Sequence, residues 1–160
     1  MISKYQYFYH MRRKEQEIKE LTQIEKIIKE ASVCRLCMAD LEFPYIIPLC
    51  FGYRDKILYF HSASEGKKIE LLKKNNKVSF EIDIPGKIIE KKKHCNWDIE
   101  YQSVIGYGIA EFVKNLEQKK AALNIILNQY SNPPFNTSDK NIHNTTIIKL
   151  NIINMTGKKS

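Results

Sequence analysis

Hydrophobic residues recur along this chain with the two periods that distinguish helices from strands. From Lys14 to Ala31 apolar residues return every third or fourth position, and charged residues fill most of the others. This spacing predicts an amphipathic helix. The same period from Lys114 to Tyr130 predicts a second helix. A shorter pattern from about Ser64 to Lys74 predicts a third, which ends at two asparagines.

Short β-rich runs lie between the helical segments. They occupy residues 33–39, 45–53, 57–61, 78–84, 103–113 and 145–155. The link at 54–56 is short enough for an antiparallel hairpin, and Pro85-Gly86 predicts another turn. Residues 131–143 contain adjacent prolines and several asparagines, which predict a loop, whereas 88–101 fit no single element.

The order of these elements favours one architecture. Short, hairpin-like links join most of the strands, and parallel strands would need longer crossover connections. We therefore expect a mainly β (α+β) fold, an antiparallel barrel with peripheral helices. Gly106 and Gly108 alternate inside the run 103–113. Such glycines often mark a bulge or a place where something approaches the backbone closely.

Length and composition suit one domain. The chain has 160 residues and a 43% apolar fraction, which is enough for a real core. Residues 1–10 fit no amphipathic template, so we expect an N-terminal extension there and a single domain over residues 11–160. The four cysteines come without secretory signs and suggest reduced thiols. Together these features predict a cytoplasmic protein.

Charge and hydropathy limit the classes of partner. No stretch approaches the run of about 20 apolar residues that a membrane span needs, and we expect no membrane partner. The chain has 26 basic and 18 acidic residues, a net charge of +8, which favours anionic partners. The charge is scattered, however, with runs only at Lys91-Lys92-Lys93 and Lys158-Lys159. Because scattered charge is a weak nucleic-acid signal, we expect no nucleic-acid partner.

The segment 58–72 carries the most informative chemistry. A strand pattern stops at a histidine, and a helix pattern begins after a small hydroxyl cluster. Ser62 and Glu65 stand three apart, as the residues of a helix N-cap pair do. A helix N-terminus offers free N–H groups and a partial positive charge, and can seat a phosphate. The donors around this seat are His61, Ser62, Ser64, Lys67 and Lys68. The same residues also suit an ordinary capped helix with a solvated lysine face.

Metal and dithiol chemistry have little support in the sequence. Cys34-Arg35-Leu36-Cys37 has the spacing of half a zinc site. In a strand, however, positions three apart point to opposite faces, so the two thiols do not easily reach one ion. The histidines lack metal-site spacing, and no glycine-rich nucleotide loop is present. We expect no metal.

Two further segments have features of either a ligand site or a strand irregularity. Pro48 interrupts a strand run, and a proline there marks an edge or a bulge. Backbone exposed at that point could hydrogen-bond a planar heterocycle. Residues 101–108 combine hydroxyl, amide and glycine positions that could serve a ligand or a strand bend.

Taken in order, five segments resemble one known family: residues 12–14, 48–53, 60–68, 103–108 and 153–158. The chain resembles the nitroimidazole-resistance (Nim) proteins, which lie within the pyridoxamine 5′-phosphate oxidase-like flavin-binding split barrels. The resemblance covers about residues 11 to 158. It implies a six-stranded antiparallel split barrel, a homodimer, and FMN bound between the protomers.

The resemblance also implies roles for individual residues. The FMN phosphate would lie at the start of the third predicted helix, and His61 would be the site histidine, near the flavin and catalytic. The implied cofactor-binding residues are Pro48, Leu49, Cys50, Phe51, His61, Ser62, Lys67, Lys68, Ser103 and Val104. Of these, Pro48 to Phe51 would face the flavin ring, and Ser103 and Val104 would help to complete the pocket.

The resulting hypothesis is an FMN-dependent oxidoreductase that reduces a nitroaromatic, such as a 5-nitroimidazole, or another small acceptor. The difficult redox chemistry would belong to the cofactor. A second hypothesis is a non-enzymatic FMN-binding or redox-sensing protein. A third is a small basic nucleic-acid-binding barrel, which the absence of a basic-aromatic motif disfavours.

Overall fold

A computed structural model describes residues 11–131 and 139–160. The predicted extension at residues 1–10 therefore lies outside the described part of the chain. The helices are α1 (Leu21–Glu30), α2 (Lys67–Lys74), α3 (Leu116–Tyr130) and α4 (Asp139–Asn144), with short 3-10 turns at Lys14–Gln16 and His94–Asn96. The strands are β1 (Glu17–Ile18), β2 (Cys34–Met38), β3 (Tyr45–Leu49), β4 (Gly52–Arg54), β5 (Ile57–Ser62), β6 (Lys77–Ile89), β7 (Asp98–Val113) and β8 (Thr146–Lys159).

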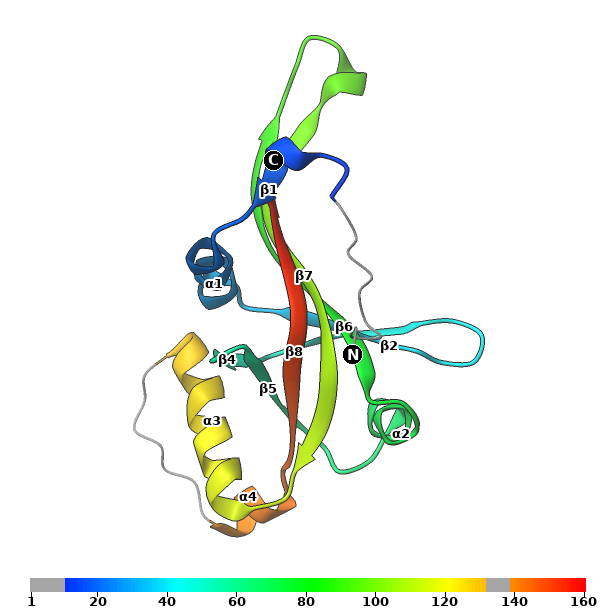
Figure 1. The fold of residues 1–160 in the computed structure, drawn as a ribbon, viewed down its shortest axis with the longest axis vertical. Coiled ribbons are helices and arrows are strands. Elements are labelled where there is room, and N and C mark those ends of the chain that lie inside the picture. Colours follow the sequence, from blue (N-terminus) through cyan, green and yellow to red (C-terminus); the bar gives the residue numbers. More distant parts are fainter. Residues whose placement is uncertain (1–10, 132–138) are drawn as a thin grey trace, which may run out of the picture.

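All the strands belong to one antiparallel sheet. Its order is β3-β2-β6-β7-β8-β5-β4, and β1 pairs with β8 outside this path. The long strand β8 runs through the centre, with α3 beside β4 and β5 and α2 beyond β6 (Figure 1). This confirms the predicted mainly β class with peripheral helices. Eight segments replace the six expected, because the run 45–53 divides into β3 and β4 and the two-residue β1 is added.

The two edges of the sheet are consecutive in sequence. β3 forms one edge and β4 the other, and only Cys50 and Phe51 join them. The sheet is therefore not closed by hydrogen bonds, but its edges are held together covalently. We call Leu49–Gly52 the seam. Pro48 lies on an edge strand, as its missing N–H donor predicts.

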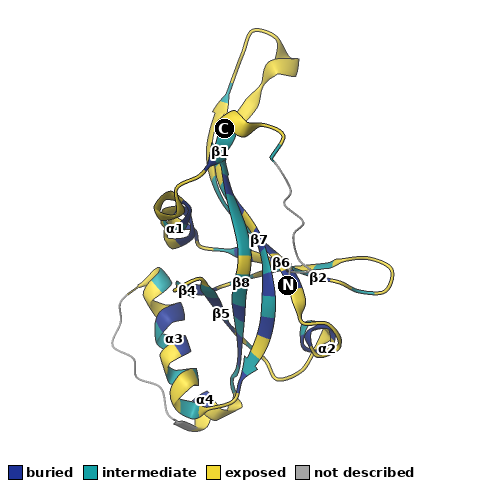
Figure 2. Ribbon diagram, in the orientation of Figure 1, coloured by how far each residue is buried: buried dark blue, intermediate teal, exposed yellow. Residues whose placement is uncertain are grey.

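The core fills the inside of this curled sheet. Phe51 from the seam, Phe60 from β5 and Phe80 from β6 are fully buried, together with aliphatic residues of α1, β2 and β8. Alternation along β2 buries Cys34 and leaves Arg35 exposed, where its guanidinium pairs with Glu81 and Asp83 of β6. Figure 2 shows buried residues on the strands and on parts of α1, α2 and α3.

Close packing and a register shift explain why β7 has glycine at positions 106 and 108. The pairing of β7 with β8 shifts register between Tyr107 and Gly108, which confirms the expected bulge. A Cβ at Gly106 would lie 2.6 Å from the Phe80 ring, and one at Gly108 would lie 2.2 Å from the Asn151 carbonyl oxygen. The close neighbours at these positions are thus the protein's own core and backbone.

Four local predictions were wrong. The first helix begins at Leu21 and not at Lys14, because Glu17 and Ile18 pair with β8 instead. Ser62 is no N-cap, since it pairs with Thr146 and continues β5. Pro85-Gly86 makes no turn, because β6 passes through it with a register shift. The loop predicted over 131–143 overlaps α4, although residues 132–138 lie outside the described part.

The hairpin prediction at 54–56 is confirmed. Asp55 and Lys56 have φ of 51° and 61° and join β4 to β5 in a tight turn. Such left-handed positions suit the turns whose twist matches that of the flanking strands.

The helix α3 holds the seam in place. The Phe51 N–H donates to the Tyr130 hydroxyl at 2.8 Å, and that hydroxyl donates to the Ser32 carbonyl at 2.9 Å. A Cβ at Gly52 would lie 2.6 Å from the Ile125 carbonyl carbon, so only glycine permits the helix to approach this closely. No helix in the described ranges is long and apolar enough to cross a membrane.

Replacing Tyr130 with phenylalanine should destabilise the fold. The change removes both hydrogen bonds and leaves the Phe51 N–H without its acceptor, at a cost of about 1–3 kcal/mol. Urea unfolding should show a lower midpoint with an unchanged slope. Tyr59→Phe is the matched control, because no hydrogen bond of the Tyr59 hydroxyl occurs within the described residues. Equal midpoints for Tyr130→Phe and the wild type would show that the seam does not depend on this hydroxyl.

Candidate functional site

A pocket lies where the seam meets α3. It has a volume of about 360 Å³ and brings together Cys50 from the seam and His61 from β5. Its other walls are residues that the sequence did not single out: Leu123, Ile126, Leu127, Tyr130 and Thr145. The pocket is within the size range of small-molecule sites, and it is mostly apolar with a few polar groups.

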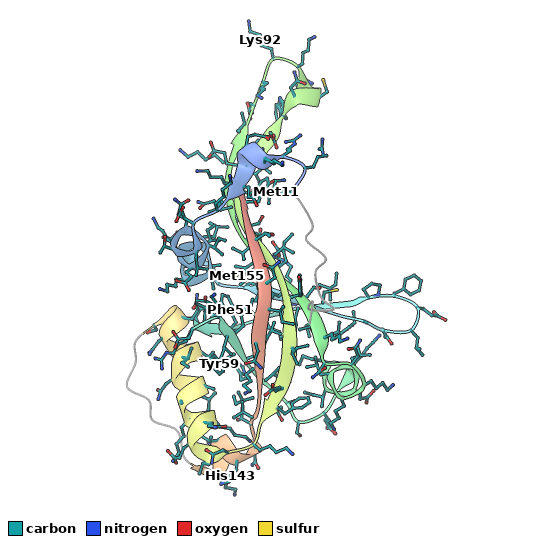
Figure 3. The ribbon with its side chains drawn as sticks, in the orientation of Figure 1. Met11, Phe51, Tyr59, Lys92, His143 and Met155 are labelled. Atoms are coloured by element: carbon teal, nitrogen blue, oxygen red, sulfur yellow. The ribbon has the colours of Figure 1, made fainter. Side chains whose placement is uncertain are left out.

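The positions of Cys50 and His61 follow from the strand connections. The tight β4–β5 turn returns the chain antiparallel to β4, so that Tyr59 pairs with Gly52, the last residue of the seam. His61 is two residues further along β5, with its side chain on the same outer face as Tyr59. The side chains that alternate with them along β5, Leu58 and Phe60, point into the core. Figure 3 shows Phe51 and Tyr59 in the region where the strands face α3.

The polar groups of the pocket differ in their availability. The Tyr130 hydroxyl is engaged at the seam, and burial raises the pKa of this phenol. The Thr145 hydroxyl donates to the Asn141 carbonyl at 2.9 Å. The His61 side chain is exposed and makes no hydrogen bond or ion pair within the described residues. It is therefore a polar group of this pocket that can take a new partner; the pocket also holds the exposed Cys50 thiol, which lies near the Tyr130 hydroxyl.

The start of α2 offers a place for an anion. Gly66 is the N-cap residue, with φ 109°, and no side chain caps the helix. The N–H groups of Ile69 and Glu70 bond to the Gly66 carbonyl, whereas no bond of the Lys67 and Lys68 N–H groups occurs in the described part of the chain. Two backbone donors at a positive helix end thus remain unused.

The two lysines of this helix start are not equivalent. The Lys67 ammonium lies 2.8 Å from the Asp40 carboxylate and 5.0 Å from the centre of the Tyr45 ring. The hydrogen bond to Asp40 raises the pKa of Lys67, and the Asp40 carboxylate already compensates the charge of its ammonium. Lys68 is half-buried, and desolvation lowers the pKa of its ammonium. No carboxylate in the described ranges pairs with Lys68, so an added anion would compensate its loss of water.

The other predicted residues divide between accessible and buried positions. Pro48 and Ser62 are at least partly exposed, while Leu49 is half-buried opposite Cys34. The Phe51 side chain is fully buried and its N–H is engaged by Tyr130. Val104 is also fully buried in the core, so only its backbone is available to a ligand.

The structure does not bring all ten predicted residues to one place. Ser62 pairs with Thr146, whereas Ser103 pairs with Lys158. These partners stand near opposite ends of β8, roughly 40 Å apart at about 3.3 Å per residue. One end of β8 therefore lies near His61, Ser62, Cys50 and the α2 lysines. The other end lies beside Ser103 and Val104.

The cysteine pattern shows the geometry expected of a strand. Cys34 is fully buried, and burial raises the pKa of its thiol, while Cys37 lies on the opposite face of β2. Within residues 11–131 and 139–160 no group of three or more His, Cys, Asp or Glu side chains is placed to hold a metal ion.

Comparison with known proteins agrees with this fold. Residues 20–159 match the family model described as pyridoxamine 5′-phosphate oxidase. A solved structure from Bacteroides thetaiotaomicron VPI-5482, described as a candidate 5-nitroimidazole antibiotic resistance protein, is 36% identical with a TM-score of 0.81. The match covers 89% of this chain and 86% of that one.

More distant structures share the fold alone. The flavocytochrome Anf3 from Azotobacter vinelandii is 15% identical with a TM-score of 0.83, covering 94% of this chain and 72% of that one. An FAD- and heme-binding protein from Mycobacterium smegmatis is 13% identical with a TM-score of 0.82. The match covers 91% of this chain and 73% of that one. Among curated proteins, none matches this chain significantly.

Proposed function

The chain belongs to the pyridoxamine 5′-phosphate oxidase family, and we propose that it is an FMN-dependent oxidoreductase. Its proposed acceptor is a nitroaromatic of the 5-nitroimidazole type or another small molecule. One observation carries the proposal. An unused anion seat at the start of α2 follows five residues after His61 in sequence, a polar group of the seam pocket with no partner among the described residues.

The residues at this seat fit a phosphate monoester. The free N–H groups of Lys67 and Lys68, the desolvated Lys68 ammonium and the Ser62 hydroxyl are all donors, and phosphate oxygens are acceptors. The seat at the start of α2 accepts one phosphate, and FMN carries one phosphate, which favours FMN over FAD. Two of the similar proteins are a 5-nitroimidazole resistance candidate and an FAD- and heme-binding protein, which supports flavin chemistry in general.

Flavin, when bound, supplies the electrons or hydride for reduction of the acceptor. The work of this chain is to bind, orient and shield. Lys68 and the α2 N-terminus hold the anionic end, and the apolar α3 residues Leu127 and Ile126 exclude water on one side of His61. In this proposal the His61 imidazole donates a proton or hydrogen bond to charge that develops on the acceptor.

A non-enzymatic FMN-binding or redox-sensing protein is the alternative. It is favoured by the small number of reactive side chains among the described residues of the seam pocket, which are His61 and the exposed thiol of Cys50. The two functions share the phosphate seat and differ in whether His61 changes the rate of electron transfer.

We further propose that the site is completed by a second copy of the chain. Ser103 and Ser62 lie near opposite ends of β8, a gap longer than one FMN molecule, so one protomer cannot present both to the same flavin. Ile46 and Ile105, on the same uncovered face of the sheet, are 60% and 57% exposed. Exposed apolar faces of this kind are typical of protein interfaces.

The ribbon formed by residues 84–99 supports the same proposal. It projects beyond the body of the molecule, with Lys92 near its tip (Figure 3). Its cross-strand pair Ile88 and Ile99 and its Trp97 are exposed. Because an isolated two-stranded ribbon is only marginally stable in water, contact with a partner subunit would stabilise these residues.

Replacing Lys68 with alanine should weaken FMN binding by about ten-fold or more, because a charge-assisted contact contributes about 1.5–3 kcal/mol. Riboflavin binding should change much less, since riboflavin has no phosphate. Lys67→Ala is the matched control and should have the smaller effect, because Asp40 already pairs with Lys67. Fluorescence titrations with FMN, FAD and riboflavin measure the affinities. Equal losses for FMN and riboflavin, or tighter binding of FAD than FMN, would contradict the proposed seat.

A purified sample should contain a dimer with bound FMN, and dilution should release the flavin together with dissociation. The reason is that both protomers contribute to each site. Light scattering with an absorbance trace at flavin wavelengths measures the two events at once. A monomer that retains its flavin would refute the shared site while leaving the phosphate seat intact.

Chemically reduced flavin in the protein should be reoxidised by a nitroimidazole faster than free reduced FMN under anaerobic conditions. His61→Ala should slow this step by about 10²-fold or more, the usual range for a lost proton donor, while FMN stays bound. His143→Ala is the control, since His143 is an exposed histidine of α4 outside the pocket. If the flavin bound to the wild type and to His61→Ala is reoxidised no faster than free reduced FMN, the oxidoreductase proposal is refuted. The flavin-binding alternative then takes its place.

A further inference from the structure

A second pocket lies between α2, α3, the C-terminal end of β7 and the N-terminal end of β8. Its volume is about 410 Å³, and it shares no residue with the seam pocket. It is lined by Ser64, Ile69, Lys73, Phe112, Val113, Lys114, Lys119 and Thr146. Of its residues only Ser64 is among the predicted donors around the phosphate seat, and none is among the residues implied to bind the cofactor.

The pocket has a positive rim. Three lysines line it, and no acidic residue of the described ranges does. The Lys119 ammonium is fixed by backbone carbonyls, donating to Thr145 at 2.7 Å and His143 at 3.0 Å, so no carboxylate cancels its charge. Lys73 and Lys114 make no ion pair or hydrogen bond within the described ranges. Their ammonium groups are free to take an anion.

The floor of the pocket is apolar. Ile69 and Val113 are buried, and the partly buried Phe112 ring packs against the core. The hydroxyls of Ser64 and Thr146 add two donors, and neither makes a hydrogen bond in the described part of the chain. A ligand that uses the whole pocket therefore needs an apolar body and an anionic group at one end.

We propose that this pocket binds a small amphiphilic anion, an aryl or alkyl carboxylate or phosphate monoester. Its anionic group contacts Lys73 and Lys114, and its apolar body lies on Ile69 and Phe112. An inorganic anion leaves the floor uncovered, and a neutral aromatic leaves the lysines without a partner. The combination of rim and floor thus selects molecules that have both parts.

Amide chemical-shift titration of the purified protein tests the site. 3-Phenylpropionate should bind saturably and shift the amides of residues 112–114 and 146. Acetate and 3-phenylpropanol, which each lack one part, should bind at least five-fold more weakly. Phenyl phosphate, compared with 3-phenylpropionate, distinguishes a phosphate from a carboxylate ligand. Excess FMN should not displace the probe, because none of the proposed phosphate ligands Ser62, Lys67 and Lys68 lines this pocket, and this holds whether or not the protein is an oxidoreductase.

Lys73→Gln and Lys114→Gln should each weaken 3-phenylpropionate binding by about five-fold or more. Lys29→Gln, an exposed lysine in the last turn of α1, is the matched control and should leave the affinity unchanged. The proposal is overturned if the acid and the alcohol bind equally, if both rim variants bind as tightly as the wild type, or if FMN displaces the probe.

Discussion

The covalent link between the two edge strands governs the rest of this structure. Because Cys50 and Phe51 alone join β3 to β4, the sheet has to curl until its edges meet. Curling encloses the core, which Phe51 enters from the seam itself. It also leaves backbone that no neighbouring strand pairs, and the Tyr130 hydroxyl of α3 satisfies one such N–H. The seam pocket is a consequence, since α3 covers the seam incompletely beside His61.

The anion seat depends on a different local feature, the way α2 begins. Ser62 continues β5 as far as its pairing with Thr146, and the helix then starts after Gly66 without a capping side chain. The uncapped start leaves two N–H groups unused, whereas a capping serine would have satisfied one of them. The departure from the expected N-cap pair therefore makes this end a better anion site than the sequence alone indicated. Asp40 meanwhile separates the roles of the two lysines by pairing with Lys67.

The sequence predicted those parts of the fold that depend on local pattern. The hairpin at 54–56, the helix α3 and the edge position of Pro48 follow from turn length, apolar period and a missing N–H donor. What could not be predicted depends on distant pairing. Glu17 and Ile18 read as helix until β8 supplies strand partners, and Ile126 and Leu127 read as an ordinary apolar helix face until the seam is placed beneath them. Only the structure shows that Leu127 and Tyr130, at the end of this apolar face, are exposed beside the seam.

The separation of Ser62 from Ser103 along β8 connects fold to assembly. A strand long enough to support the whole sheet necessarily holds its two ends apart, and the family residues fall at both ends. If the proposed assembly is correct, a single copy presents two incomplete half-sites, and the site forms only in the dimer. A two-fold partner would bring one end of its own β8 against the other end of this one, and every such contact would occur twice. The exposed Ile105 lies beside Ser103 in β7, so the apolar surface that would drive association adjoins the half-site that it would complete.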